Sequence, residues 1–534
     1  MSQTRVPQPD GFVWWKHGVI YQIYPRSFQD ANGDGVGDLA GVIDRLDYLV
    51  ELGVDAVWLS PIFRSPMADF GYDVSDHVAI DPLFGDMKTF RALVRAAHAR
   101  GLKIILDYIP NHTSDQHLWF HESRSSRENP RRDWYIWRDP AADGGPPNNW
   151  RSEFGGPAWT IDPLTGQYYY HAFLASQPDL NWRNRDVVGA MLNVLRFWLD
   201  RGVDGFRVDA IHHLIEAEDL TDNPINRDWR DGMAPAKQLL RDHTVDHPQV
   251  HDAIAAMREI SDRYGDDRIL IGEAYLPIDR LMAYYGGAAD GFHLPFNFHL
   301  MEINWTARDV ADLIVAYEAK LPAHGWPNWV LGNHDRQRLA SRLGPAQARV
   351  AAMLLLTLRG TPTLYQGDEL GMTDVPIPPE RVRDPFEINV PGLGLGRDPV
   401  RSPMPWDTSP NAGFSSAEPW LPLGDDWPTR NVATQSGQPA SMLGLYRDLL
   451  NLRHTEAALS HGDFSLLSAG DSVLAFERAH AGRRLLIALD LSGHGGEVAC
   501  PPGGVLLTTG GEVTRLAKDA LKLGGDQGVI IALA

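Results

Sequence analysis

The chain has 534 residues, of which 43% are hydrophobic and 22% are charged, as in ordinary globular proteins. This length exceeds what one hydrophobic core can organise, so we expect one large domain with at least one smaller companion. Its 49 basic and 69 acidic residues give a formal net charge of −20, which argues against nucleic acid or an anionic membrane as a partner.

The N-terminal sequence and the cysteine content favour a cytoplasmic location. The opening MSQTRVPQPDGFVWW has no basic segment followed by an apolar core, so we predict no signal peptide. The single cysteine, Cys500, excludes an internal disulfide bond. The most apolar run, Val350 to Leu358, is too short to span a membrane and is interpreted as a buried helix.

Short β-rich runs alternate with amphipathic helical patterns along most of the chain. The predicted strands are Val19 to Tyr24, Ala56 to Ser60, Lys103 to Tyr108, Gly205 to Val208, Ile269 to Gly272, Gly291 to Leu294, Trp329 to Gly332 and Pro362 to Tyr365. The helical patterns between them include Leu39 to Leu52, Met87 to Arg100, Val187 to Arg201 and Ala346 to Leu358. This alternation predicts an α/β fold, a TIM (β/α)8 barrel, with a doubly wound sheet as the alternative.

Two connections are much longer than a barrel needs. Segment 110–181, after the third strand, is rich in Trp, Pro, Gly and Asn and is predicted to form an inserted subdomain B, and segment 367–439 follows the eighth strand. After a helix at Met442 to Arg453, short strands with glycine turns predict an antiparallel β domain over 455–534. The catalytic barrel would then comprise 1–109 and 182–454.

The loop after the first strand, DANGDGVGD, carries Asp30, Asn32, Asp34 and Asp38 at alternating positions around glycines. Hard oxygen ligands at this spacing suit Ca²⁺ or Mg²⁺. A solvated acidic turn is the alternative for so short a motif.

The fourth predicted strand lies in GVDGFRVDAIHH and carries Arg207 and Asp209 at its end. Because side chains alternate along a strand, both point to the same side, and a charged residue in such an apolar run needs a partner. One interpretation is a buried structural ion pair. The other is a carboxylate kept ionised by the arginine, which would lower its pKa and suit it to act as a nucleophile.

The other strands also end in polar residues. The third is followed by Asp107, Asn111 and His112, the fifth by Glu273, and the seventh by Asn333, His334 and Asp335. In a β/α barrel these ends converge on one site. Carboxylates, two histidines and an arginine would therefore meet there, which favours catalysis over packing.

Two carboxylates in one site push their pKa values apart, as glycoside hydrolysis requires. Asp209, beside Arg207, is predicted to be the ionised nucleophile. Glu273 follows the apolar run LIG and has no cation adjacent in sequence, so it is predicted to be the protonated acid. Asp335 would bind sugar hydroxyls or stabilise positive charge in the transition state.

Four ordered segments, DYIPNHTS, GFRVDAIHH, IGEAY and LGNHD, resemble the signature regions of the α-amylase superfamily, glycoside hydrolase family 13. With QPDLNW at Gln177 to Trp182, the chain is most similar to the α-glucosidase and oligo-1,6-glucosidase branch. The resemblance extends over essentially the whole chain, including the inserted loop and the β domain. It implies Asp209 as nucleophile, Glu273 as general acid and base, and Asp335 as transition-state stabiliser.

The resemblance also implies residues that bind the nonreducing glucosyl unit. His112, Arg207 and His334 match residues that hold this unit, and in MADFGYD Asp69 and Tyr72 match the base that closes the pocket and makes relatives exo-acting. An arginine of GRDPVRSP completes the pocket in relatives; we favour Arg401, with Arg397 as the alternative. Similar enzymes bind a structural divalent ion at the first loop, where Val36 completes the implied ligand set, and no organic cofactor is expected.

The sequence therefore predicts a cytoplasmic, retaining, exo-acting α-glucosidase, monomeric or homodimeric, that hydrolyses short α-glucosides such as maltose, isomaltose or sucrose. Transglucosylation uses the same site and stays open, as do an oligo-1,6-glucosidase and a sucrose-acting glucosyltransferase or isomerase; trehalose synthase is a less favoured relative. The residue after the nucleophile is valine in similar enzymes that prefer α-1,6 bonds and threonine in those that prefer α-1,4 bonds, but here it is Ala210. Linkage preference is left undecided. A noncatalytic sugar-binding or transporter-associated relative is disfavoured because the chain retains all three carboxylates.

Overall fold

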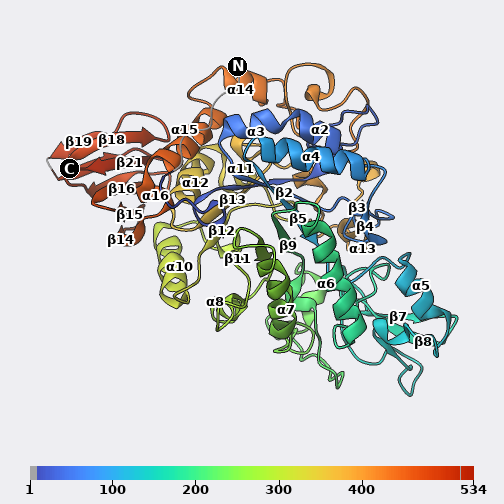
Figure 1. Ribbon diagram of the computed structural model, residues 1–534. Coiled ribbons are helices and arrows are strands. Elements are labelled where there is room, and N and C mark those ends of the chain that lie inside the picture. Colours follow the sequence, from blue (N-terminus) through green and yellow to red (C-terminus); the bar gives the residue numbers. More distant parts are fainter. Residues whose placement is uncertain (1–8, 518) are drawn as a thin grey trace.

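Eight parallel strands form a closed barrel at the centre of the molecule (Figure 1). The computed structural model describes residues 9–517 and 519–534. Around the barrel the strand order is β1-β13-β12-β11-β10-β9-β5-β2, and every pairing is parallel. The strands are β1 (Ile20–Ile23), β2 (Ala56–Leu59), β5 (Lys103–Tyr108), β9 (Gly205–Val208), β10 (Ile269–Gly272), β11 (Leu294–Asn297), β12 (Asn328–Val330) and β13 (Thr361–Tyr365). The predicted (β/α)8 barrel is confirmed.

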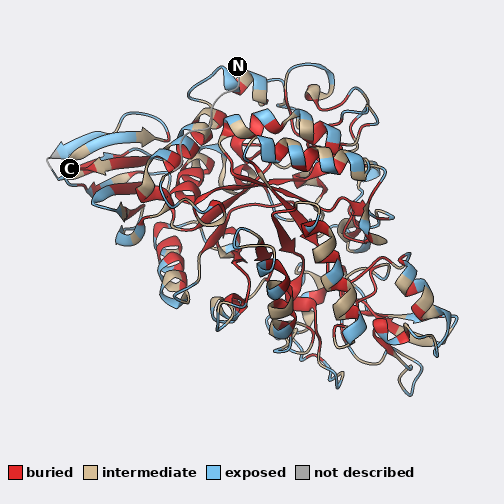
Figure 2. Ribbon diagram, viewed as in Figure 1, coloured by how far each residue is buried: buried red, intermediate tan, exposed pale blue. Residues whose placement is uncertain are grey.

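The barrel strands are buried on both faces (Figure 2). One face fills the barrel interior, where Trp58, Ile105, Ile271 and Phe296 belong to one apolar cluster. The opposite face packs against the surrounding helices in a larger cluster that continues into the C-terminal region. This two-sided burial explains why the strands appear in the sequence as short continuous apolar runs.

Most of the longer helices cover the outside of the barrel, and several of them, such as α4 and α6, expose a polar face (Figure 2). They are α1 (Trp14–His17), α2 (Leu39–Asp44), α3 (Leu46–Leu52), α4 (Met87–Ala99), α5 (Leu118–Ser125), α6 (Arg185–Leu199), α7 (Val250–Asp262), α8 (Ile278–Leu281), α9 (His299–Glu302), α10 (Ala307–Lys320), α11 (Leu339–Leu343), α12 (Pro345–Thr357), α13 (Pro385–Asn389), α14 (Val432–Ser436), α15 (Met442–Thr455) and α16 (Ala457–Ser460). Side-chain caps define several starts: Asp86 accepts a hydrogen bond from the Thr89 amide, and Asn184 accepts one from Asp186.

Two predicted elements differ in the structure. The single helix predicted over Leu39 to Leu52 is wrong, because the chain breaks at Arg45, with φ −105° and ψ 7°. The Arg45 side chain donates to Gln29 at 2.7 Å and lies over the Trp406 ring, so tertiary contacts hold this residue in the break.

The sixth strand lies further along the chain than predicted: β11 begins at Leu294, where the prediction ended. Gly291 belongs to a turn in which its amide donates to the Tyr285 carbonyl at 3.2 Å. A Cβ at Gly291 would lie 2.3 Å from the Tyr284 carbonyl oxygen, so the close backbone approach requires glycine there. Pairing with β10 starts only at Leu294, opposite Ile271.

Additional structure surrounds the barrel. After β2, β3 (Phe63–Arg64) pairs with β4 (Asp76–Ile80). After β5, the chain forms α5 and a three-stranded antiparallel sheet of β6 (Trp137–Arg138), β8 (Gln167–Tyr170) and β7 (Trp159–Asp162). This part has its own apolar cluster, which includes Trp150 and Trp159, and it projects from one side of the barrel (Figure 1).

The C-terminal region forms two antiparallel sheets (Figure 1). The five-stranded sheet has the order β14-β15-β16-β21-β18, and the three-stranded sheet has the order β17-β20-β19. Their bounds are β14 (Asp463–Ala469), β15 (Val473–His480), β16 (Arg483–Asp490), β17 (Gly496–Ala499), β18 (Gly503–Thr508), β19 (Thr514–Ala517), β20 (Ala520–Leu523) and β21 (Gly528–Leu533). The predicted antiparallel C-terminal fold is confirmed. Among the described helices, none combines the length and apolar composition needed to cross a membrane.

Two buried arginines join the C-terminal region to the barrel. Arg453 donates to the carbonyls of Leu356 and Gly360 at 3.0 and 2.5 Å, and Arg478 donates to that of Thr357 at 2.5 Å. These carbonyls lie at the end of α12 and just beyond it, where helical backbone acceptors lack intrahelical partners. The arginines satisfy them inside the core.

Replacing Arg453 by methionine should therefore lower the free energy of unfolding by about 2–4 kcal/mol, because buried carbonyls lose their donors. Urea titration followed by tryptophan fluorescence measures the change. Arg483→Met is the control, since its ion pair with Glu456 is partly exposed and should contribute less than about 1 kcal/mol. Equal effects of the two substitutions would contradict this assignment.

Candidate active site

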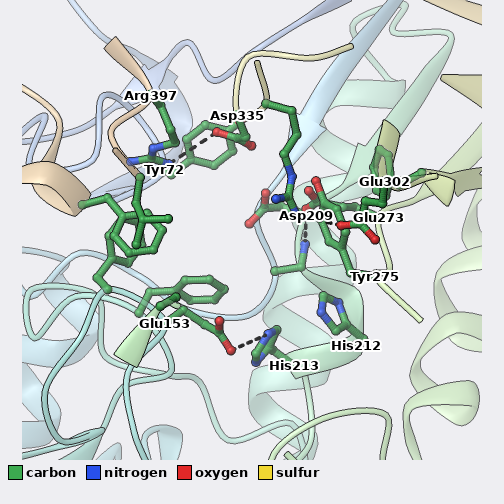
Figure 3. A pocket seen from close by; sticks show the side chains of 18 of the residues that line it. Tyr72, Glu153, Asp209, His212, His213, Glu273, Tyr275, Glu302, Asp335 and Arg397 are labelled. Atoms are coloured by element: carbon green, nitrogen blue, oxygen red, sulfur yellow. Dashed lines mark hydrogen bonds and ion pairs between the residues drawn. The ribbon is translucent and has the colours of Figure 1, made fainter. Parts of the chain in front are cut away.

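A cavity of about 920 Å³ opens at the carboxyl ends of the barrel strands (Figure 3). Asp209 follows β9, Glu273 follows β10 and Asp335 lies just beyond β12, and all three line the cavity. Parallel strands in a closed barrel bring these sequence-distant carboxylates to one rim. The convergence predicted for these three residues is observed.

Arg207 is the common partner of the buried acids. Its Nη1 lies 2.7 Å from Asp107 Oδ1 and 2.6 Å from Asp209 Oδ1, while its Nη2 lies 2.7 Å from Glu273 Oε1. Strand register produces the cluster, because β9 pairs with β5 at Asp107 opposite Arg207 and with β10 at Ile271 opposite Arg207. The predicted Arg207–Asp209 pairing is present. No cation is adjacent to Glu273 in the sequence, as expected, but Arg207 lies next to it in space.

The expectation of a lowered pKa at Asp209 is wrong for this arrangement. Burial raises the pKa of Asp209 to about 7, and the negative charges of Asp107 and Asp335 act in the same direction. Arg207 opposes this rise, but it shares its charge among three carboxylates. Desolvation therefore outweighs the one cation.

Glu273 has an equally perturbed pKa. Burial raises the pKa of Glu273 to about 7, with the charges of Asp209 and Asp335 contributing, against the lowering effect of Arg207. The Ala210 amide donates to Glu273 Oε2 at 2.9 Å, from a left-handed backbone with φ 43°. Two acids that titrate near neutrality can together hold one proton, which supplies one carboxylate and one carboxylic acid. Their distinct roles therefore rest on the motif rather than on different pKa values.

Asp335 has the opposite electrostatic character. Burial favours its neutral form, but His334, Arg397 and Arg401 more than compensate, and the pKa of Asp335 is well below its usual range. Arg401 Nη2 lies 2.8 Å from Asp335 Oδ1, and Arg397 Nη1 lies 3.4 Å from the same oxygen. Asp335 thus presents a permanent negative charge to the cavity.

Arg397, and not the favoured Arg401, lines the cavity beside Asp69. Its Nη2 lies 2.6 Å from Asp69 Oδ1 and 2.7 Å from Asp384 Oδ1. Arg401 is fully buried behind Asp335, and its Nε donates to the His334 carbonyl at 2.9 Å. In the segment after β13, Arg397 is the one of the two candidate arginines that contacts Asp69, whereas the favoured Arg401 contacts Asp335 from behind.

The remaining predicted sugar-binding residues divide into two groups. Asp69, Tyr72 and His112 line the cavity. Arg207 and His334 are only 1% and 0% exposed, so they orient the residues in front of them and present almost no surface to a ligand. His334 lies 2.6 Å from the Tyr72 hydroxyl through Nε2 and its ring stacks on that of Tyr72.

Gln177 and Asp384 were not predicted as site residues. Gln177 Nε2 donates to Asp69 Oδ2 at 3.2 Å and lies 3.2 Å from His112 Nε2. Gln177 belongs to the QPDLNW segment, so this motif could have identified it as a site residue. No motif near Asp384 indicated its bond to Arg397.

The other side of the cavity carries a second polar group (Figure 3). Glu153 Oε1 lies 2.7 Å from Arg241 and 3.8 Å from His213 Nε2. His212 and His213 are buried, and the Nδ1 atom of each has no hydrogen-bond partner among the described residues. Both histidines were visible in DAIHH, directly after the predicted nucleophile, but Glu153 and Arg241 come from distant loops.

The predicted metal-binding loop folds around its own amides. Asp30 accepts from Asn32 and Gly33 through Oδ1 and from Gly35 through Oδ2, at 2.7–3.0 Å, while Asp38 caps α2 by accepting from Gly41 at 2.7 Å. Within the described residues, no three His, Cys, Asp or Glu side chains form a cluster that could hold a metal. Burial nevertheless raises the pKa of Asp38, with the Asp30 charge contributing, so two acids lie close together beside the Asn32 and Asp34 oxygens. This donor chemistry fits a hard cation.

The sequence matches the family model described as alpha amylase, catalytic domain, over residues 22–462. It is 42% identical to a probable alpha-glucosidase of Rhizobium meliloti over 494 residues, covering 90% of this chain and 89% of that protein. It is 37% identical to an oligo-1,6-glucosidase of Parageobacillus thermoglucosidasius, covering 90% and 91%. The amino acid transporter heavy chain SLC3A1 of Homo sapiens is 41% identical, covering 88% and 69%.

Solved structures show the same architecture. The alpha-glucosyl transfer enzyme XgtA superimposes with a TM-score of 0.91 at 40% identity, covering 98% of this chain and all of the other. The trehalulose synthase MutB of Pseudomonas mesoacidophila MX-45 superimposes with a TM-score of 0.90 at 34% identity, with coverage of 98% and 100%.

The opposite pKa shifts predict opposite effects on stability. An unfolded aspartate has a pKa of about 3.9, whereas that of folded Asp209 is about 7. Between these values the folded protein holds a proton that the unfolded chain lacks, so the stability falls as the pH rises through this window. Asp209→Asn should therefore stabilise the protein by about 1–3 kcal/mol at pH 8 relative to pH 4.

Asp335→Asn is the matched comparison. Because the pKa of Asp335 is depressed on folding, its ionised form stabilises the protein above the unfolded pKa, and asparagine should destabilise it at pH 8. Scanning calorimetry of both variants and the wild type at the two pH values measures the signs. A destabilised Asp209→Asn protein at pH 8 would contradict the electrostatic description.

Proposed function

This chain belongs to the α-amylase family, in its α-glucosidase and oligo-1,6-glucosidase branch, and is a glycoside hydrolase. We propose that it removes terminal nonreducing α-glucosyl units from short α-glucosides with retention of configuration. One observation carries the proposal: Asp209, Glu273 and Asp335 meet at a cavity whose sugar end is closed by the Asp69–Arg397 ion pair.

The proposed reaction has two displacements. Asp209 attacks the anomeric carbon while Glu273 gives its proton to the leaving oxygen, forming a covalent glucosyl-enzyme. Glu273 then takes a proton from water, which attacks the same carbon and releases Asp209. Asp335, ionised throughout, faces the positive charge that develops on the sugar ring in both transition states.

The closed base supports exo action. Asp69 and Arg397 are joined at 2.6 Å, and Gln177 lies 3.2 Å from Asp69 on its other oxygen. Such a base leaves no passage for a chain to continue beyond the glucosyl unit, so only a chain end can bind there. The charged and amide groups supply hydrogen bonds for sugar hydroxyls.

Transglucosylation is the second candidate, supported by the size and lining of the cavity. A volume of about 920 Å³ leaves room beyond a single glucosyl unit, and His212, His213 and Glu153 line that additional space. An acceptor hydroxyl held there could replace water in the second displacement. Sucrose-acting isomerisation belongs to the same class, and maltose, isomaltose and sucrose are the proposed substrates.

We also propose that Ca²⁺ or Mg²⁺ binds the loop 30–38. Asp30, Asn32, Asp34 and Asp38 would supply side-chain oxygens and Val36 its carbonyl, a hard-donor set. Support comes from the geometry of the two acids, because the Asn32 amide donates to both Asp30 Oδ1 and Asp38 Oδ2, at 3.0 and 3.2 Å, and so holds the two carboxylates side by side. A bound cation would neutralise these two acids and crosslink the loop, which is a structural role.

Proton NMR of the first products tests the reaction. With maltose, isomaltose and sucrose as substrates, the glucosyl unit should appear first as α-glucose, or as a new α-glucoside when transfer occurs. Asp209→Asn should reduce turnover more than about a thousandfold while remaining folded. Initial β-glucose would overturn the double displacement, and near wild-type activity of the folded variant would overturn the role of Asp209.

Thermal unfolding with and without a chelator tests the ion. After treatment with EDTA, calcium or magnesium at a hundred times its dissociation constant should stabilise the wild type by about 2.7 kcal/mol. Asp30→Asn should remove this response, and Asp44→Asn, at an exposed position in α2, should retain it. Identical unfolding temperatures with EDTA and with either ion would refute the site.

A further inference from the structure

Residues 384–397 form a compact loop whose two ends are tied together at the cavity. Arg397 donates to Asp384 through its backbone amide, its Nε and its Nη2. Asp398 accepts from the amides of Arg383 and Asp384 at 2.6 and 2.9 Å. Closed loops of this length are often functional parts of a surface.

Glu387, on the short helix α13, holds the glycine-rich part of this loop. Its Oε1 accepts from the Gly392 amide at 2.9 Å and its Oε2 from the Gly396 amide at 3.3 Å. One carboxylate thus bridges both ends of residues 392–396, which we call the lip. Gly392 and Gly394 have φ of +82° and +65° with open space around them, so the backbone of the lip is otherwise weakly constrained.

The lip lies at the mouth of the cavity. Gly394, Leu395 and Gly396 line the cavity, and Gly392 and Gly394 are also exposed to solvent. The loop also packs on the inserted segment after β5 within the cavity wall: the rings of Phe386 and Phe154, which both line the cavity, lie 5.2 Å apart. Ala234 and Lys237 line the same cavity.

The position of the lip determines which part of a substrate it meets. The closed base at Asp69 and Arg397 takes the glucosyl unit, so the mouth takes the group attached to it, the aglycone. We propose that Glu387 is a positioning residue that fixes the lip, and that the fixed lip restricts the aglycone to about one sugar unit. This inference rests on the proposed exo-glucosidase function.

Removal of the Glu387 carboxylate frees both amides of the lip. The lip can then move outward while Arg397 stays bonded to Asp384, so the mouth widens without loss of the sugar pocket. Longer aglycones gain space that one-sugar aglycones do not need. The effect should therefore appear in the ratio of specificity constants and not as a uniform loss of activity.

The experiment compares a disaccharide with a tetrasaccharide of the linkage that the wild type hydrolyses, from the maltose or isomaltose series. Glu387→Ala should raise the tetrasaccharide-to-disaccharide ratio of kcat/KM by about fivefold. Gly396→Ala should act in the same direction while keeping the carboxylate, because its Cβ would lie 2.9 Å from Glu387 Cβ. Glu380→Ala, at an exposed position earlier in the same segment, should leave the ratio unchanged.

The outcomes separate the inference from the function on which it rests. A purely structural role of Glu387 would lower the unfolding temperature and reduce both specificity constants equally, leaving the ratio constant. An unchanged ratio in folded Glu387→Ala and Gly396→Ala proteins overturns the inference. A wild type that acts on neither series and not on sucrose overturns the proposed function itself.

Discussion

The buried guanidinium of Arg207 is the interaction on which the site depends. It contacts Asp107, Asp209 and Glu273 within 2.7 Å, so three acids can be buried at one rim without three separate cations. An uncompensated carboxylate there would be strongly destabilising. Because the single charge is shared, however, it leaves Asp209 and Glu273 with pKa values of about 7, where an acid and a base can coexist.

Asp335 shows how neighbouring cations and exposure together set the charge of a carboxylate. Its side chain is 23% exposed, against 10% for Asp209 and 8% for Glu273, and it faces Arg397 and Arg401, so it remains ionised. Arg397 contributes to this ionisation and also pairs with Asp69. One side chain therefore couples the charge of Asp335 to the position of Asp69, and Asp384 in the same segment holds it in place.

The barrel and its loops serve different purposes. Strands buried on both faces form the rim, and two buried arginines bind the end of α12: Arg478 joins strand β15 of the C-terminal sheet to it, and Arg453 joins α15 to it. The loops add the variable walls: the segment after β5 supplies Glu153 and Phe154, and the segment after β13 supplies Arg397 and the lip. The three carboxylates thus lie directly beyond the strand ends, while loops supply the remaining walls of the cavity.

The sequence by itself determined the barrel, its strand ends and the three carboxylates, because apolar periodicity and residues adjacent to strands are local properties. Gln177 and the two histidines after Asp209 also occur within motifs recognised in the sequence. Only the tertiary structure decided that Arg397 and not Arg401 lines the cavity, that Arg207 also pairs with Glu273, and that burial raises the pKa of Asp209. The tertiary structure also decided where the helix breaks at Arg45 and where β11 starts. Contact with Trp406 fixes Arg45, and pairing with β10 fixes the start of β11. Charge balance, burial and loop path depend on groups far apart in the chain, and no local pattern encodes their distances.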